Sequence, residues 1–345
     1  IPYVGSVDAF DVGGGSEPDP TNNTVNKFAY ASDVITKSFT TIPSGTYYTS
    51  SGGGLSSTTE GYVVGGFKFS LGPALGFGNR RLSKFNFSSG AATAFPTTYV
   101  PVQIAGGAVA SSTPYGYGFL GASSMAPTSA PQIKQKVAFA TDVFSVSGTA
   151  TPVTHEYATG CQSLTFGYEI GGALASTPPT VADSNKIRKY PFANDGNPVE
   201  ITSSLAIYPY GLIRSTATQG IDDAGYIIGG ETKIPSGPPP FIRSVETVLR
   251  FPFSSDTDTV ATVGDVTPTI QLAPSGTKPT VGRAAWPGVT HGYWNGGYGY
   301  GPLLPGDPNF RLLTKFAWGS AVTLTALGDL GRGFDASGTA SGIQI

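Results

Sequence analysis

The sequence predicts an all-β fold, a single six-bladed β-propeller whose blades are four-stranded antiparallel sheets. Three observations support this prediction. An aromatic–glycine motif recurs six times along the 345 residues, a basic–aromatic motif follows each copy, and helical periodicity is absent throughout. Successive copies lie about 50–65 residues apart, a period typical of propeller blades.

The first motif is an aromatic residue, usually after glycine, then two mostly apolar residues and one or two glycines. Its copies lie at 61–66, 116–121, 167–172, 225–230 and 292–297, with a degenerate copy at 9–14. Neighbouring blades cover both faces of a blade, so its inner strands should be nearly continuous apolar runs, as at Val63 and Val64. The glycine pair allows a positive φ where the chain leaves the strand, and a close approach of adjacent blades.

The second motif is a basic residue followed by aromatic residues at the first and third positions after it. Its six copies begin at Lys27, Lys84, Lys136, Lys189, Arg250 and Lys315, and the third copy keeps only one aromatic residue. A short polar cluster and a run of β-formers follow, which predicts a hairpin turn into an outer strand. We expect each basic side chain to pack along its blade and pair locally, and not to form an anion-binding ring.

A strand of small residues precedes each copy of the first motif, as at 104–111. The first copy has almost nothing before it, and the last small-residue strand, near 331–341, has no copy after it. We therefore expect the ring to be closed by pairing of the N- and C-terminal strands. The single domain 1–345 then divides into blades at 333–345 plus 1–46, 47–100, 101–152, 153–206, 207–270 and 271–332.

The composition argues against several partners. Charged residues make up 12% of the chain, against about 25% in typical soluble domains, and the net charge is −2. Without a run of Lys or Arg there is no electrostatic footprint for nucleic acid. No apolar stretch approaches the ~18 residues of a membrane helix, so no membrane insertion is expected. The N-terminal residues lack the charged and apolar regions of a signal peptide.

The sequence predicts no enzyme activity, no cofactor and no metal site. His155, His291 and Cys161 are the only histidines and cysteine, too few to build a first shell from separate blades. His291 occupies a variable position before the Gly-Tyr pair. Asp256 and Asp258 fit a turn better than a calcium site, because other copies carry only Gly or Ser there. Carboxylates brought together from separate blades remain an alternative.

The predicted binding surface is the ring face from which the loops after the glycine pairs leave. These loops differ in length and share prolines, which lower the entropy cost of ordering them. Exposed aromatic residues on them would provide the anchors that interfaces favour. The candidate binding residues are Phe67, Phe77, Phe241, Tyr298 and Tyr300. The alternative is that the prolines only stiffen long loops and the aromatic rings cap the ends of the ring.

A strand ending in Gly-Gly, followed by a strand with a fixed aromatic residue, resembles the Kelch repeat, which implies the fold of the galactose oxidase central domain. Three segments are similar to degenerate Kelch-like repeats of marine bacteriophages and their cyanobacterial hosts. They are Arg-Phe-Pro-Phe-Ser-Ser-Asp at 250–256, Val-Gly-Asp-Val-Thr at 263–267 and Thr-His-Gly-Tyr at 290–293. The repeats cover essentially the whole chain.

This resemblance implies a non-catalytic structural or adhesive protein at the virion surface, such as a phage tail fibre, an appendage or a capsid decoration. The expected partners are other virion structural proteins, or a host surface glycan or receptor used for host attachment. The alternative is a secreted, extracellular lectin or a galactose oxidase- or sialidase-like enzyme. Against the enzymes, the chain has two histidines, and its arginines show no sialidase-like triad.

Overall fold

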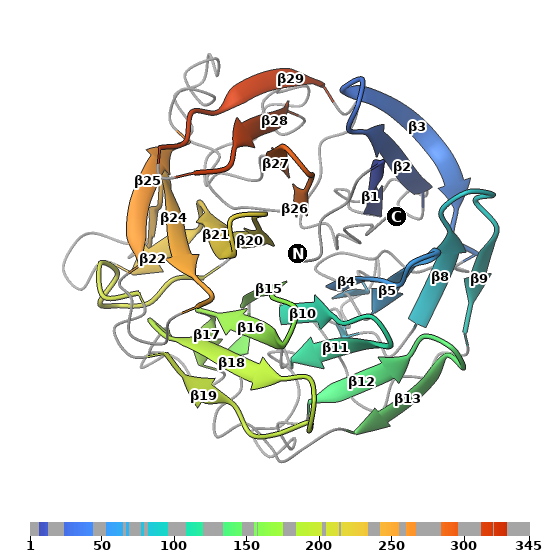
Figure 1. Ribbon diagram of the computed structural model, residues 1–345, viewed down its shortest axis with the longest axis horizontal. Helices are drawn as coiled ribbons and strands as arrows, with labels where there is room; N and C mark the ends of the chain where they lie inside the picture. Colours follow the sequence, from blue (N-terminus) through green and yellow to red (C-terminus); the bar gives the residue numbers. More distant parts are fainter. Residues whose placement is uncertain are drawn as a thin grey trace.

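The computed structural model places six antiparallel sheets around a common axis, which confirms the six-bladed β-propeller (Figure 1). The structure describes residues 7–12, 24–43, 53–64, 67–68, 77–78, 82–95, 108–119, 134–146, 155–156, 158–174, 184–201, 205–213, 215–233, 242–254, 260–266, 284–295, 312–319 and 321–329. Every regular element within these ranges is a strand. In this part of the chain there is accordingly no helix with the length and apolar character needed to cross a membrane.

Each blade follows the same path from the axis outward, and we call its four strand positions a, b, c and d (Figure 1). In blade 2 these strands are β4 (Gly53–Ser56), β5 (Glu60–Val64), β8 (Leu82–Asn86) and β9 (Ala92–Ala94). In blade 3 they are β10 (Ala108–Ser111), β11 (Tyr115–Phe119), β12 (Gln135–Ala138) and β13 (Val143–Val146). In blade 4 they are β15 (Thr159–Gln162), β16 (Phe166–Ile170), β18 (Ile187–Pro191) and β19 (Val199–Glu200).

The last two blades continue the pattern. Blade 5 consists of β20 (Thr216–Gln219), β21 (Ala224–Ile228), β24 (Thr247–Pro252) and β25 (Ala261–Asp265). Blade 6 consists of β26 (Ala284–Pro287), β27 (His291–Asn295), β28 (Leu312–Ala317) and β29 (Thr325–Asp329). The first sequence motif therefore forms strand b in each blade, and the second motif forms strand c.

Blade 1 is described as three strands, β1 (Asp8–Val12), β2 (Thr24–Ala29) and β3 (Val34–Thr41), at positions b, c and d. The strand that we expect from 333–345 lies outside the described residues, so closure by pairing of the chain ends stays a prediction. Side chains close the ring between blades 6 and 1: Trp286 Nε1 donates to the Phe10 carbonyl oxygen at 3.0 Å. The Tyr30 hydroxyl donates to the Pro287 carbonyl oxygen at 3.2 Å.

The described apolar residues form six core clusters, and each cluster lies between two neighbouring blades. Between blades 1 and 2, for example, Phe10 packs against Val63 and Phe85. Between blades 6 and 1, Trp286 and Leu313 pack against Phe28. Strands b and c are buried on both faces because successive side chains point to opposite neighbours, which explains their nearly continuous apolar sequence.

The glycine before the tyrosine in strand b is required by the ring opposite it. Gly225 pairs with Phe251 across the ladder, and a Cβ atom at Gly225 would lie 2.3 Å from that ring. Gly292 has the same relation to Phe316, again at 2.3 Å. The glycine pair at the end of strand b serves the expected purpose, since Gly229 and Gly230 have φ of 61° and 111°.

Replacing Gly225 with Ala should therefore destabilise the protein by about 1–3 kcal/mol, because the new methyl group overlaps the Phe251 ring. The Gly225→Ala, Phe251→Leu double variant should lose less stability than the sum of the losses of the two single variants, since the smaller leucine side chain leaves room for the methyl group. Chemical denaturation measures both effects, with Thr58→Ala in an exposed turn as a neutral control. Additive losses would show that the ring does not impose the glycine.

Candidate functional site

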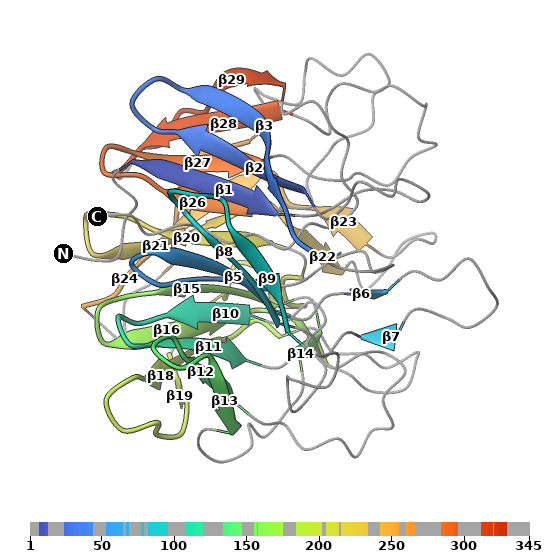
Figure 2. The ribbon, with the colours of Figure 1, turned by 90° about the vertical axis from the view of Figure 1, so that its right-hand side faces the viewer.

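The two faces of the ring are built differently. Turns from strand a to b and from c to d lie on one face, which we call the turn face. The connections from b to c leave the other face, and two of them form two-stranded ribbons that project beyond the blades (Figure 2). These ribbons are β6 (Phe67–Lys68) with β7 (Phe77–Gly78), and β22 (Glu231–Lys233) with β23 (Ile242–Ser244). We call this second side the ribbon face.

A third two-stranded ribbon pairs β14 (His155–Glu156), which precedes strand a of blade 4, with β17 (Ala173–Leu174), which follows strand b. Of the five candidate binding residues, Phe67 and Phe77 come together in one ribbon, where Phe67 pairs with Gly78 and Phe77 with Lys68. Phe241, Tyr298 and Tyr300 lie outside the described residues. The ribbon face is therefore the ring face that the sequence analysis predicts as the binding surface.

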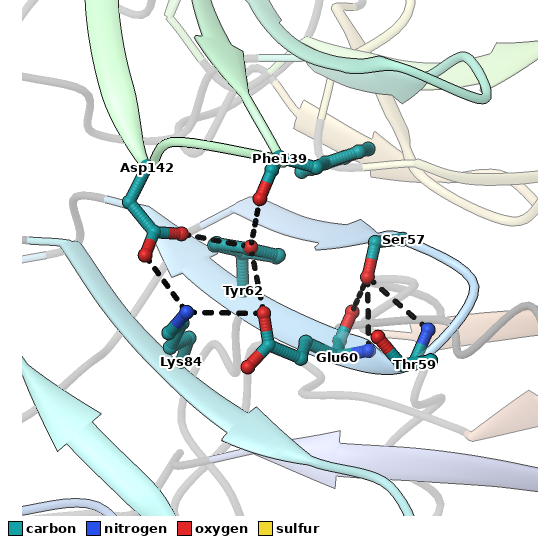
Figure 3. Close-up of polar contacts among 7 residues, drawn as sticks. All are labelled: Ser57, Thr59, Glu60, Tyr62, Lys84, Phe139 and Asp142. Atoms are coloured by element: carbon teal, nitrogen blue, oxygen red, sulfur yellow. Dashed lines mark hydrogen bonds and ion pairs between the residues drawn. The ribbon is translucent and has the colours of Figure 1, made fainter.

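The turn face carries a polar network that the sequence did not predict. Between blades 2 and 3, the hydroxyl of Tyr62 lies 2.9 Å from Asp142 Oδ1 and 3.0 Å from Glu60 Oε2 (Figure 3). Lys84 Nζ lies 2.7 Å from Asp142 Oδ2 and 3.1 Å from Glu60 Oε2. Tyr62 and Lys84 face each other on strands b and c of blade 2, whereas Asp142 belongs to blade 3. The network therefore fastens one blade to the next.

Local turn geometry positions these side chains. Asp142 ends the c–d turn of blade 3, where its N–H donates to the Ala138 carbonyl oxygen at 2.8 Å and its φ is 58°. Aspartate tolerates this left-handed conformation better than most residues. Glu60 starts strand b after a tight turn in which Ser57 Oγ accepts bonds from the N–H groups of Thr59 and Glu60, at 3.2 and 2.9 Å (Figure 3).

The same three-residue contact recurs at two other blade boundaries. We call it the interblade latch: a tyrosine from strand b and a lysine from strand c of one blade, with an aspartate from the c–d turn of the next. Each of the three aspartates has a φ between 53° and 58°. The latches are Tyr62–Lys84–Asp142, Tyr117–Lys136–Asp195 and Tyr293–Lys315–Asp33.

At two blade boundaries another contact takes the place of the latch, because the c–d turn of the following blade has no acidic residue. Between blades 5 and 6, the Tyr226 hydroxyl accepts a bond from Gly319 N–H at 2.8 Å, and Arg250 Nε pairs with Asp222 of its own blade at 2.9 Å. Between blades 1 and 2, the tyrosine position is Phe10, whose ring stacks on Phe87 with centroids 5.0 Å apart.

The expectation of local pairing holds for some of the basic residues, whereas Lys84, Lys136 and Lys315 pair with an aspartate of the next blade. Lys27 pairs with Asp8 within blade 1 at 2.6 Å. Within blade 4, Lys189 Nζ lies 4.7 Å from the centroid of the Phe166 ring, and between blades 4 and 5 Tyr168 stacks on Phe253. Together with the ion pairs of the latches, these contacts confirm that the repeated basic residue of strand c acts within the blade framework.

Burial and neighbouring carboxylates raise the pKa of the latch tyrosines, which stay protonated at neutral pH. Burial, followed by the charge of Asp195, raises the pKa of Tyr117 to about 12. Burial also raises the pKa of Tyr62 and Tyr293 above the ordinary tyrosine range, and their aspartate partners add to this. Burial lowers the pKa of Lys84, but its hydrogen bonds to Asp142 and Glu60 outweigh that effect and raise it. The raised pKa of the three latch tyrosines and of Lys84 therefore favours their protonated forms.

A second buried polar group lies between blades 3 and 4. Glu169 in strand b of blade 4 accepts a bond from the Tyr190 hydroxyl at 2.6 Å and lies 3.9 Å from Arg188. Lys134 is 2% exposed, between the rings of Tyr117 and Tyr190, and burial lowers its pKa. The signal in the sequence was a glutamate in an otherwise apolar strand b, the position of Val63 in blade 2.

Of the residues weighed as metal ligands, His155 and Cys161 lie at blade 4 and His291 lies in blade 6, whereas Asp256 and Asp258 lie outside the described residues. Cys161 is buried in β15, and burial raises the pKa of its thiol. His291 begins β27, where its Nδ1 lies 2.8 Å from Thr290 Oγ1. His155 begins β14. Among the described residues, no three or more His, Cys, Asp and Glu side chains form a group with the geometry to hold a metal ion.

Replacing Asp142 with Gly should lower the free energy of unfolding by about 1–2 kcal/mol, because glycine keeps the positive φ but removes both side-chain contacts of the latch. Asp142→Asn should cost less, since its amide oxygen still accepts from Tyr62 and only the ion pair with Lys84 is lost. Urea denaturation measures both variants.

The matched control is Asp223→Gly, because Asp223 is an exposed aspartate with a φ of 54° in another turn. It reports the effect of glycine on the backbone alone. Equal losses for Asp142→Gly and Asp223→Gly would show that the latch contributes nothing to stability.

Comparisons with known proteins agree with the fold. No family model and no curated protein sequence matches the chain. Among solved structures 218 chains match. One of them, titled "Structure of YjhT", is similar with a TM-score of 0.65 and 12% sequence identity, over 92% of this chain and 97% of that chain. At this identity the likeness shows a shared β-propeller fold and no more.

Proposed function

We propose that the protein is a non-catalytic structural and adhesive propeller of a virus particle, a tail fibre, appendage or capsid decoration. It binds neighbouring virion proteins or a host surface receptor through the ribbon face. The observation that carries this proposal is the contrast between the two faces: tight hydrogen-bonded turns on one, and ribbons that project beyond the blades on the other (Figure 2).

A rigid frame with variable loops on one side is the usual arrangement of a binding scaffold. The latches and the apolar clusters fix each blade against the next, so the bases of the ribbons are held at defined positions. The β6–β7 and β22–β23 ladders restrain the chain between strands b and c before any partner binds. Such restraint lowers the entropy cost of binding, and the prolines of these loops have the same effect.

The virion assignment is supported by the sequence resemblance to degenerate Kelch-like repeats of marine bacteriophages and their hosts. The low charge of the chain, 12% of residues, favours a partner recognised by aromatic, hydroxyl and backbone groups. The same property favours a second candidate, a secreted carbohydrate-binding or carbohydrate-active propeller. Co-purification with virus particles distinguishes the two, since a secreted propeller would be recovered only free in solution.

Replacing Phe241, Tyr298 and Tyr300 with Ala should weaken attachment by about 1–2 kcal/mol at each true anchor and leave the melting temperature unchanged. The measurement is co-sedimentation of the labelled chain with purified particles and with host cells. Val143→Ala and Val199→Ala, at exposed positions of the outer strands, are the controls. Unchanged attachment in all three loop variants would refute the ribbon face as the binding surface.

A further inference from the structure

One of the three latch aspartates is followed by glycine. Asp33 and Asp142 are each followed by a valine, whereas Asp195 is followed by Gly196. The Asp195–Gly196 pair lies in the c–d turn of blade 4, between β18 and β19, and both residues are partly exposed. A branched side chain after an aspartate shields the amide nitrogen that joins the two residues, and glycine has no side chain to do so. Asp195 is therefore the latch aspartate most open to attack by its own backbone.

The reaction open to such an Asp–Gly bond is rearrangement to isoaspartate. The Gly196 nitrogen attacks Cγ of Asp195, the new C–N bond closes a cyclic imide, and the carboxyl hydroxyl group leaves as water with the amide proton. Water then adds to the main-chain carbonyl carbon of Asp195, where the original C–N bond breaks. The chain afterwards runs through Cβ and Cγ of residue 195. The water lost in the first step is regained in the second, so no other reactant is needed.

Contacts of the folded chain oppose the first step. Lys136 of blade 3 pairs with Asp195 Oδ2, and its ammonium group stabilises the charged carboxylate, which loses an oxygen as water far less readily than the neutral acid. The N–H of Gly196 donates to Asn194 Oδ1 at 3.0 Å, which fixes the orientation of the attacking amide. The carbonyl oxygen of Gly196 accepts from Lys134 Nζ at 3.4 Å. The turn is thus held on both sides of the reactive bond.

We propose that the Asp195–Gly196 bond is a site of spontaneous isoaspartate formation, which the latch between blades 3 and 4 keeps unreacted while it is closed. Isoaspartate adds a methylene group to the backbone of the turn and leaves the free carboxylate directly on Cα. The contacts with Tyr117 and Lys136 are made by an ordinary aspartate side chain at a φ of 53°. The rearranged residue changes both the turn and the reach of the carboxylate, so the reaction opens this latch, and refolding does not restore it.

This inference goes beyond the proposed function, because it concerns the chemical lifetime of the frame and not what the ribbon face binds. The latches of Asp33 and Asp142 should outlast that of Asp195, since a valine follows each of them. The boundary between blades 3 and 4 is then the first latch that an ageing propeller loses. Failure of this inference would leave the ribbon-face proposal unchanged, because the modified turn lies on the opposite face.

The test is incubation of the purified full chain at neutral pH and raised temperature, followed by peptide mapping with electron-transfer mass spectrometry, which distinguishes isoaspartate from aspartate. A synthetic peptide of residues 192–198 gives the rate without the fold. We expect the intact chain to react more slowly than the peptide. Lys136→Met should speed the reaction at residue 195 about fivefold or more, because loss of the charged contact raises the open population of the latch.

The matched control is Lys84→Met, which removes the equivalent lysine from the latch between blades 2 and 3 and leaves the turn of Asp195 intact. It reports any acceleration that follows from a general loss of stability. Asn194→Ala, at an exposed position, removes the acceptor of the Gly196 N–H and should also speed the reaction. A wild-type chain that reacts as fast as the peptide would overturn the proposal. A rate in Lys136→Met no higher than in Lys84→Met would overturn it as well.

Discussion

The arrangement of the ring depends on the contact between side chains of strands b and c of one blade and the c–d turn of the next blade. Each four-stranded ladder lies within one blade, so the ladders do little to specify how neighbouring blades sit; an exception is Val322 N–H of blade 6, which donates to the Val263 carbonyl oxygen of blade 5 at 2.7 Å. Apolar packing between blades is strong but not directional. The charge-assisted bonds of the interblade latch supply direction, because Tyr62 and Lys84 meet Asp142 in one relative position of the two blades.

The sequence predicted what is encoded within a blade. Six copies of two motifs identified strands b and c, and the glycine pairs identified where strand b ends. The latch was not predicted, because Tyr62 and Asp142 are 80 residues apart and, among the described residues, the aspartate is found at three blade boundaries. The buried pair of Glu169 with Arg188 was also missed, since its significance depends on packing between blades 3 and 4. The aromatic residues proposed for binding lie between the strand motifs in the sequence, where hydrophobic periodicity does not predict the position of a side chain.

The division between the two faces links the structure to its proposed roles. Tight turns, internal ion pairs and aspartates of positive φ make the turn face a fixed surface. The ribbon face carries the variable connections, so its loops can change without disturbing contacts between blades.

The most direct test of the latch is the ionisation of its tyrosines, followed by NMR of ring-labelled tyrosine and by circular dichroism as the pH is raised. The pKa of Tyr62, Tyr117 and Tyr293 is raised in the folded protein, so the native state holds these protons more tightly than the unfolded state. Stability is then retained below about pH 10 and lost as the pH rises beyond it. The account predicts that these tyrosines ionise only together with the loss of β structure. Their ionisation at the ordinary tyrosine pKa, with β structure intact, would contradict it.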